Sequence, residues 1–259
     1  MSVSSKKEML RVDDLWVEVE GKEVLKGVSL TIPVGETHVL FGRNGSGKTS
    51  LLMTIMGFPA YRVRHGHIYF KGQDITHLPP YERAKLGIGI MFQRPPTIRG
   101  VKLREMLQLC ARENGYRITE LAREFGFEAF LDRDINSGFS GGELKKSELL
   151  QLLAQEPDLV LLDEPESGVD VENLEIIGRM IRKLLQKEVH RPRRKSGLII
   201  THTGFILNFV AADRGYVMLD GKISCEGNPQ EIFEGIQKHG YQECLKCLRR
   251  MEMEKTLNK

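Results

Sequence analysis

Residues 42–49 combine the residue types and the spacing that phosphate chemistry requires. They read Gly-Arg-Asn-Gly-Ser-Gly-Lys-Thr, which is the spacing of a loop that binds nucleoside triphosphates. The glycines let successive backbone N–H groups turn toward phosphate oxygens at the start of a helix. Lys48 would add a positive charge beside the β- and γ-phosphates, and the hydroxyl of Thr49 would ligate Mg²⁺. We therefore expect ATP and Mg²⁺ here, with ATP contacts from Gly42, Arg43, Asn44, Gly45, Ser46, Gly47, Lys48, Thr49 and Ser50.

The segments on either side of this loop support the same interpretation. Residues 36–41 are rich in β-branched and aromatic side chains and predict a strand, whereas residues 50–56 carry apolar side chains at helical spacing. A glycine-rich turn also joins strand to helix in folds that bind no nucleotide. The strand, the loop and the helix in this order favour phosphate binding over a plain turn.

A second candidate group ends the apolar run at residues 158–164. Such runs are typical of central parallel strands that are covered on both faces. Asp163, at the end of this strand, could hold Mg²⁺ through water, and Glu164 would point to the other side and polarise an attacking water molecule. We expect Thr49, Asp163 and Gln93 to surround the metal.

Three further segments follow in the order that a nucleotide hydrolase needs. Gln93 ends a predicted strand, where its amide could reach the metal and the attacking water. Ser140 precedes Gly141 and Gly142 and could cap a helix whose N-terminus binds an anion. His202 ends another predicted strand and could contact the γ-phosphate. A solvated glutamine, a plain loop and a core histidine are the simpler alternatives. The expected catalytic residues are Lys48, Gln93, Glu164 and His202.

The elements that must position these residues predict an α/β fold. Alternating polar and apolar residues over 10–34 predict a small antiparallel β-region. A nucleotide-binding core would comprise residues 10–93 and 153–240. Residues 94–152 have helical periodicity and predict an inserted subdomain that is all-helical. The whole of 10–240 would form a single domain.

Composition excludes some classes of function. The 38 basic and 35 acidic residues give a net charge of +3, which is too balanced for a nucleic-acid footprint. Residues 1–7 lack the apolar region of a secretory signal, and residues 198–212 are too short to span a bilayer. We therefore expect a cytoplasmic protein with no nucleic acid and no membrane insertion. In the helical tail predicted at 241–259, Cys244 and Cys247 fit reduced thiols better than a metal site.

Together these segments resemble an ABC-type ATPase cassette over residues 10 to about 235. In this resemblance residues 42–49 match the Walker A loop, residues 159–164 the Walker B strand, and Gln93 the Q-loop. The remaining matches are Ser140, Gly141 and Gly142 for the signature motif, Asp170 for the D-loop and His202 for the switch histidine. The resemblance implies an ATP-dependent homodimer, in which the signature motif of one copy closes over the ATP bound by the other.

Local features resemble the SufC-type ATPases of iron–sulfur cluster assembly in particular. They lie at residues 14–22, 93–101, 138–146 and 166–171. This resemblance implies soluble scaffold partners of the SufB and SufD type. A peripheral nucleotide-binding subunit of a membrane transporter remains the alternative. A module that binds ATP without turnover is a third possibility, but Lys48, Asp163, Glu164 and His202 are all intact.

Two features depart from the pattern. Many cassettes stack an aromatic residue on adenine near position 19, whereas this chain has Val19, with Trp16 offset. Adenine selectivity could therefore be loose. The basic segment 187–195 is longer than expected and fits either a solvated turn or a docking patch for an acidic partner.

Overall fold

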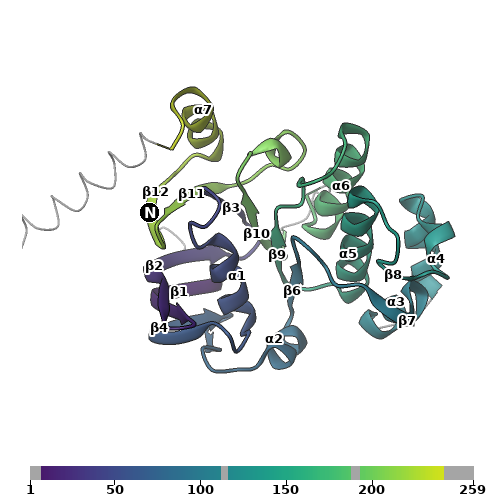
Figure 1. Cartoon of the computed structure of the whole chain (residues 1–259), viewed down its shortest axis with the longest axis horizontal. Helices are drawn as coiled ribbons and strands as arrows, with labels where there is room; N and C mark the ends of the chain where they lie inside the picture. Colours follow the sequence, from purple (N-terminus) through teal and green to yellow (C-terminus); the bar gives the residue numbers. More distant parts are fainter. Residues whose placement is uncertain (1–6, 112–115, 188–192, 242–259) are drawn as a thin grey trace, which may run out of the picture.

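The computed structural model describes residues 7–111, 116–187 and 193–241. Within them, a six-stranded sheet has the spatial order β12 (Lys222–Gly227), β11 (Arg214–Leu219), β3 (Thr37–Phe41), β10 (Ser196–Thr201), β9 (Leu159–Asp163) and β6 (Ile88–Met91). Strand β12 pairs with β11 in the antiparallel sense, and the other neighbouring strands pair in parallel. This sheet forms the middle of the molecule (Figure 1).

A second, antiparallel sheet confirms the β-region predicted at 10–34. Its order is β2 (Lys22–Pro33), β1 (Glu8–Val19), β4 (Arg62–Phe70) and β5 (Gln73–Asp74). Strand β1 is continuous from Glu8 to Val19, but its pairing with β2 shifts register between Val12 and Leu15. Asp14, inside that shift, has a left-handed backbone with φ of 43°, and this irregularity breaks the alternation.

Alternation along the buried strand β9 divides the core into two layers. Leu159 and Leu161 join a cluster with α1 (Lys48–Met56) and the antiparallel sheet. Val160 and Leu162 join a second cluster on the other face with α5 (Gly141–Gln155) and α6 (Val171–Leu184). Because successive side chains of a strand point to opposite faces, α1 and α5 are held on opposite sides of the sheet, as Figure 1 shows.

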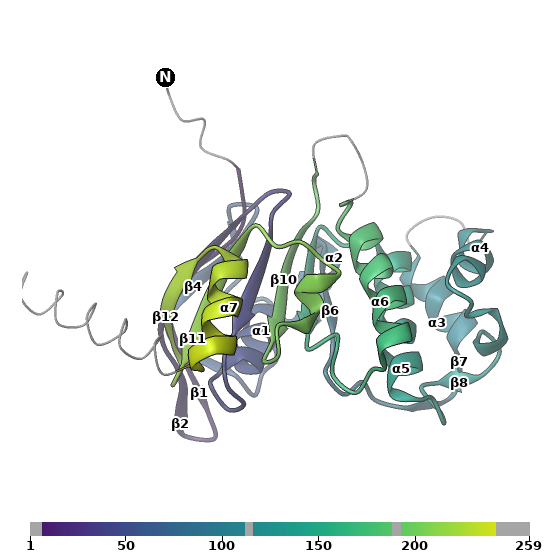
Figure 2. The same ribbon diagram turned by 90° about the horizontal axis from the view of Figure 1, so that it is seen from above.

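The remaining helices cover the sheet edges and the far end of the molecule. Helix α2 (Pro80–Leu86) follows β5, and α7 (Pro229–His239) packs against β11 through Phe233. Short 3-10 turns occur at Glu128–Phe130 and Phe205–Asn208. Figure 2 shows α3 (Leu103–Cys110) and α4 (Tyr116–Glu124) at the end of the molecule away from β1 and β2.

The expectation of an all-helical segment at 94–152 was wrong in one respect. Strand β7 (Ile98–Lys102) pairs with the short strand β8 (Asp134–Ile135) in an antiparallel ribbon. Residue 101 therefore lies in a strand, and α3 begins only at Leu103. Ion pairing between Lys102 and Asp134, at 2.8 Å, supports the ribbon. Helix α5 also continues through Gln155, past the boundary predicted at residue 152.

The parallel strands end level with one another at their carboxyl edge. Asp163 at the end of β9 lies opposite Ile200, and Thr201 at the end of β10 lies opposite Phe41. Met91, at the end of β6, lies opposite Leu162. Ligands of open α/β sheets bind in the crevice outside this edge. The register therefore brings four predicted site residues to the same edge as the phosphate loop. They are Asp163 and Glu164 at the end of β9, Gln93 after β6 and His202 after β10.

Helix α1 is fixed at its C-terminal end by a buried arginine. The guanidinium of Arg83 donates hydrogen bonds to the carbonyl oxygens of Thr54 and Ile55 at 2.9 and 2.8 Å, and to those of Leu78 and Thr76 at 2.7 and 2.9 Å. Arg83 is only 2% exposed, and burial lowers the pKa of its guanidinium to about 10. The charge therefore persists at neutral pH, and the guanidinium supplies donors both to carbonyls in the last turn of α1 and to the segment before α2.

We expect Arg83→Met to destabilise the fold by about 3 kcal/mol, because it leaves several buried carbonyls without donors. The measurement is the free energy of unfolding from urea denaturation. Lys85→Met on the exposed side of the same helix is the matched control, and it should change stability by less than about 0.5 kcal/mol. Equal effects of the two substitutions would contradict the anchoring role of Arg83.

Candidate functional site

The phosphate loop has the backbone geometry that its glycines suggested. Gly45 and Gly47 have left-handed φ values of 80° and 106°, which glycine adopts without strain. A Cβ atom on Gly47 would also lie 3.0 Å from the carbonyl oxygen of Val24. Both glycines therefore serve the close turn from β3 into α1, which starts at Lys48.

The side chain of Lys48 folds back along the loop. Its Nζ donates to the carbonyl oxygens of Gly42 and Arg43 at 2.8 and 2.9 Å. The residue is 5% exposed. Burial lowers the pKa of this ammonium group, and the carboxylates of Glu164 and Asp163 oppose the shift. A cation is thus held over the opening of the loop, where phosphate groups would offer it stronger partners than two carbonyls.

Two of the three predicted metal ligands, Thr49 and Asp163, lie in contact, whereas the amide of the third, Gln93, contacts Glu164. The hydroxyl of Thr49 donates to Asp163 Oδ2 at 3.0 Å. The other carboxylate oxygen, Oδ1, is buried without a hydrogen-bond partner, and burial raises the pKa of Asp163. A buried orphan oxygen next to a hydroxyl fits Mg²⁺, which prefers oxygen ligands and retains water. Among the described residues, no group of three or more His, Cys, Asp or Glu side chains is placed to hold a metal ion.

Glu164 is the centre of a second group of polar side chains. The Gln93 amide nitrogen donates to its Oε2 at 2.7 Å. His202 Nδ1 lies 3.0 Å from its Oε1 but is not aligned for a hydrogen bond. The backbone of Glu164 is left-handed, with φ of 48°, a strained conformation that recurs at functional sites. The structure thus unites three residues that lie far apart in the sequence.

A hollow of about 690 Å³ lies at the phosphate loop. Its walls include most of the predicted loop residues together with Gln93 and Glu164, whereas Asp163 and His202 are not among the lining residues. Sequence reasoning missed a further set on β2 and on the turn between β11 and β12: Glu23, Val24, Lys26, Asp220 and Gly221. Asp-Gly between two apolar strands is a hairpin signal, but nothing local shows that this turn lies over the loop. Val24 rather than Val19 lines the hollow, and Trp16 instead donates to Asp14 Oδ1 at 3.0 Å.

The predicted signature residues lie elsewhere. Ser140 caps α5 as predicted, because its Oγ accepts from the Glu143 backbone N–H at 3.4 Å while the Glu143 carboxylate accepts from the Ser140 backbone N–H at 2.6 Å. Ser140 is exposed, and neither it nor the two following glycines line the hollow. Asp170 caps α6 by accepting from the Asn173 backbone N–H at 2.8 Å.

Helix α5 also holds the backbone at Gln93, which the sequence did not reveal. Lys145 Nζ donates to the carbonyl oxygens of Phe92 and Gln93 at 3.2 and 2.9 Å. Glu148 Oε2 accepts from the Phe92 N–H at 3.2 Å. Both side chains are buried. Movement of α5 would therefore move Gln93, whose amide contacts Glu164.

Glu148 gives the fold a specific pH dependence. Burial raises its pKa to about 7 from 4.5. Because the pKa of this carboxyl is higher in the folded chain than in the unfolded chain, its contribution to the free energy of unfolding is fully present below the unfolded-state pKa. That contribution is lost as the pH rises through the folded-state pKa of about 7. Glu148→Gln keeps an acceptor for Phe92 without the charge. It should therefore gain stability relative to the unmodified chain between about pH 5 and about pH 8, by at most about 3 kcal/mol. The test is urea denaturation of both proteins at pH 5 and pH 8. If the free energies of unfolding of the two proteins changed by the same amount between these pH values, the prediction would be contradicted.

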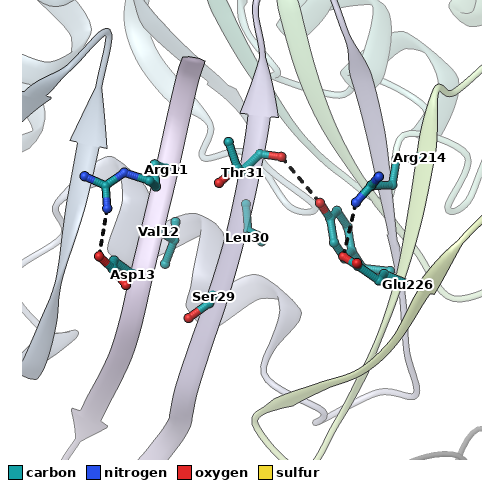
Figure 3. A pocket seen from close by; sticks show the side chains of 9 residues that line it. Arg11, Val12, Asp13, Ser29, Leu30, Thr31, Arg214 and Glu226 are labelled. Atoms are coloured by element: carbon teal, nitrogen blue, oxygen red, sulfur yellow. Dashed lines mark hydrogen bonds and ion pairs between the residues drawn. The ribbon is translucent and has the colours of Figure 1, made fainter. Parts of the chain in front are cut away.

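A second hollow, of about 310 Å³, lies between β1, β2 and the β11–β12 pair (Figure 3). Its charges are already paired, Arg11 with Asp13 at 2.7 Å and Arg214 with Glu226 at 3.4 Å. It has neither a glycine-rich loop nor a helix start among its lining residues. The hollow at the phosphate loop is therefore the candidate site.

Some expectations concern residues outside those that the structure describes. Cys244 and Cys247 and the helical tail predicted at 241–259 fall there, except for Tyr241. So does most of the basic segment 187–195. At its near end, Lys187 pairs with Asp213 at 3.1 Å.

Comparison with known proteins identifies the family. A family model described as "ABC transporter" matches residues 25–167. A probable ATP-dependent transporter of Synechocystis is 38% identical, over 90% of this chain and 94% of that protein. Vegetative protein 296 of Bacillus subtilis is 37% identical, over 90% of this chain and 91% of that protein.

Solved structures agree with the sequence comparison. A nucleotide-free ATP-binding cassette from an ABC transporter has a TM-score of 0.74 at 26% identity, covering 89% of this chain and 95% of that chain. The ADP conformation of an ATP-binding cassette of an ABC transporter has the same TM-score and identity, and the match covers 93% of this chain and 98% of that chain. The chain therefore belongs to the ABC transporter family, as an ATP-binding cassette with the α/β fold of that family that hydrolyses ATP.

Proposed function

We propose that this ATPase works as a Mg²⁺-dependent pair of cassettes and drives conformational change in a soluble scaffold for iron–sulfur cluster assembly, of the SufB and SufD type. The observation that carries the hydrolytic part is the group formed by Glu164, Gln93 and His202 beside the phosphate loop. The scaffold part rests on the resemblance of segments 93–101 and 138–146 to SufC-type ATPases.

The chemistry follows from the positions of the side chains. Glu164 is the acceptor that orients a water molecule for attack on the γ-phosphorus, and Gln93 fixes its carboxylate. His202, beside the same carboxylate, would donate to a γ-phosphate oxygen. As the bond from the γ-phosphorus to the β–γ bridging oxygen breaks, Lys48 would offset the negative charge on the phosphates.

Magnesium fits the pair formed by Thr49 and Asp163. Bound there, the ion would neutralise charge on the β- and γ-phosphate oxygens. The Thr49 hydroxyl and the orphan oxygen of Asp163 would hold it, with Gln93 as the further ligand that we predicted. The hydrogen bond from Thr49 to Asp163, at 3.0 Å, keeps both oxygens together before the ion arrives.

Pairing of two cassettes explains why the signature residues lie outside the hollow. Ser140 is exposed at the start of α5, on the opposite side of the sheet from α1. An exposed helix N-terminus attracts phosphate, but within one chain this terminus does not line the nucleotide hollow. In a head-to-tail pair, Ser140, Gly141, Gly142 and Asp170 of one copy would close over the ATP of the other.

A membrane transporter is the second candidate, because relatives such as the Synechocystis protein are named as probable ATP-dependent transporters. In the part of the chain that the structure describes, no helix is both long and apolar enough to cross a membrane. A peripheral subunit and a cytoplasmic scaffold ATPase are both compatible with this finding.

Anaerobic purification of the tagged chain, with mass spectrometry of the proteins that accompany it, separates the two. Scaffold proteins that raise its ATPase rate would support the proposal. A polytopic membrane protein in their place would favour the transporter. An untagged culture processed in parallel controls for proteins that adhere to the resin. Full activity of the chain alone, with no partner of either kind, would contradict both.

A further inference from the structure

Glu166 is a buried carboxylate to which the sequence assigned no role. It is 7% exposed. Its Oε1 accepts hydrogen bonds from the hydroxyls of Thr201 and Thr203, the latter at 2.9 Å. Its Oε2 is buried without a hydrogen-bond partner. Burial also raises the pKa of this carboxyl. A buried and incompletely paired carboxylate costs stability, so its presence beside the catalytic residues calls for an explanation.

The two hydroxyls lie on either side of His202 in the sequence. Thr201 Oγ1 also accepts the backbone N–H groups of Thr203 and Gly204, at 3.2 and 2.8 Å. Thr203 Oγ1 accepts the N–H of Phe205 at 3.3 Å. Each threonine thus joins Glu166 to the backbone of the loop after β10. The chain immediately before and after the histidine is fixed to one carboxylate.

The turn that contains Glu166 is tied to the end of β10 through its neighbours. The N–H of Glu164 donates to the carbonyl oxygen of Ile200 at 3.0 Å, and the N–H of Ser167 donates to that of Glu164 at 3.1 Å. Glu166 is therefore part of a short turn that starts at the catalytic carboxylate. This turn and the loop of His202 are held in one network, and the His202 ring lies 3.0 Å from Glu164.

We propose that Glu166 is a positioning residue for hydrolysis, which holds His202 beside Glu164 through the hydroxyls of Thr201 and Thr203. The inference rests on the role proposed above for His202 at the γ-phosphate. A displacement of a catalytic group by about 1 Å can cost up to about 100-fold in rate. The phosphate loop is outside this network, so the affinity for ATP should stay the same.

Single-turnover hydrolysis by Glu166→Leu and Glu166→Gln tests the proposal. The leucine variant removes both acceptors, and its rate should fall by roughly 10-fold to 100-fold with unchanged KM and ATP affinity. The glutamine variant keeps an amide oxygen for the two hydroxyls and should recover most of the rate. Equal losses in the two variants, or a loss that appears in KM, would overturn the inference.

The same substitution in a His202→Ala background separates positioning from general damage. If Glu166 acts through His202, Glu166→Leu should cause no further loss there. The same fold-loss with and without the histidine would overturn the inference. Thr203→Val, which removes one of the two donors, replaces the leucine variant if that one does not fold. A His202→Ala chain with normal hydrolysis would instead refute the role proposed for the histidine.

Discussion

Replacing Glu164 by glutamine is expected to leave ATP bound and to slow its hydrolysis by roughly 100-fold to 10,000-fold, the usual contribution of a positioned base. The amide keeps the size of the carboxylate and can still accept the hydrogen bond from Gln93. It loses the negative charge that orients the attacking water. Because the phosphates then persist, two cassettes should remain closed around them, and the variant should become a stable dimer in ATP.

Phosphate release and light scattering after size-exclusion chromatography measure the two effects. Glu231→Gln, the same change at an exposed position in the first turn of α7, is the matched control and should behave like the unmodified chain. Normal turnover by the Glu164 variant would show that another group orients the water.

Lys48→Ala is expected to weaken ATP binding by about 100-fold, because it removes a charge-assisted contact to the phosphates. In the unmodified chain, Lys48 Nζ donates hydrogen bonds to carbonyl oxygens of the loop. Loss of the Lys48 side chain should therefore disturb ATP binding more than folding. Calorimetric titration with ATP gives the affinity, and circular dichroism verifies the fold. Lys238→Ala, on the exposed side of α7, is the control for loss of a positive charge. Undiminished affinity in Lys48→Ala would contradict the assignment of the loop.

Local signals in the sequence predicted the parts of the site that local chemistry builds. The loop at 42–49 carries its own glycines, lysine and threonine, and the strand and helix beside it have clear periodicities. Ser140 was predicted as a cap because serine is a favoured residue at a helix start, and the structure adds that Glu143 completes a capping box with it. The run that ends in Asp163 indicated a central strand because both of its faces are apolar.

Pairing between distant segments could not be predicted in the same way. The ribbon of β7 with β8 was missed because β8 covers only Asp134–Ile135, which is too short to show alternation. Lys145 and Glu148 look like ordinary polar positions of a helix, and only tertiary packing turns them toward the backbone of Phe92. Glu166 was overlooked for the same reason, since its partners lie on β10 and the loop after it.

Mixing two inactive variants tests the shared site most directly. Lys48→Ala disables the phosphate loop and leaves the signature residues intact, whereas Ser140→Arg blocks the signature and leaves the loop intact. If each site joins the loop of one chain to the signature of another, a mixed pair holds one working site. Random pairing of equal amounts should then restore about one quarter of the unmodified hydrolysis rate, because about half of the pairs are mixed. A mixture no more active than the two variants apart would contradict the shared site.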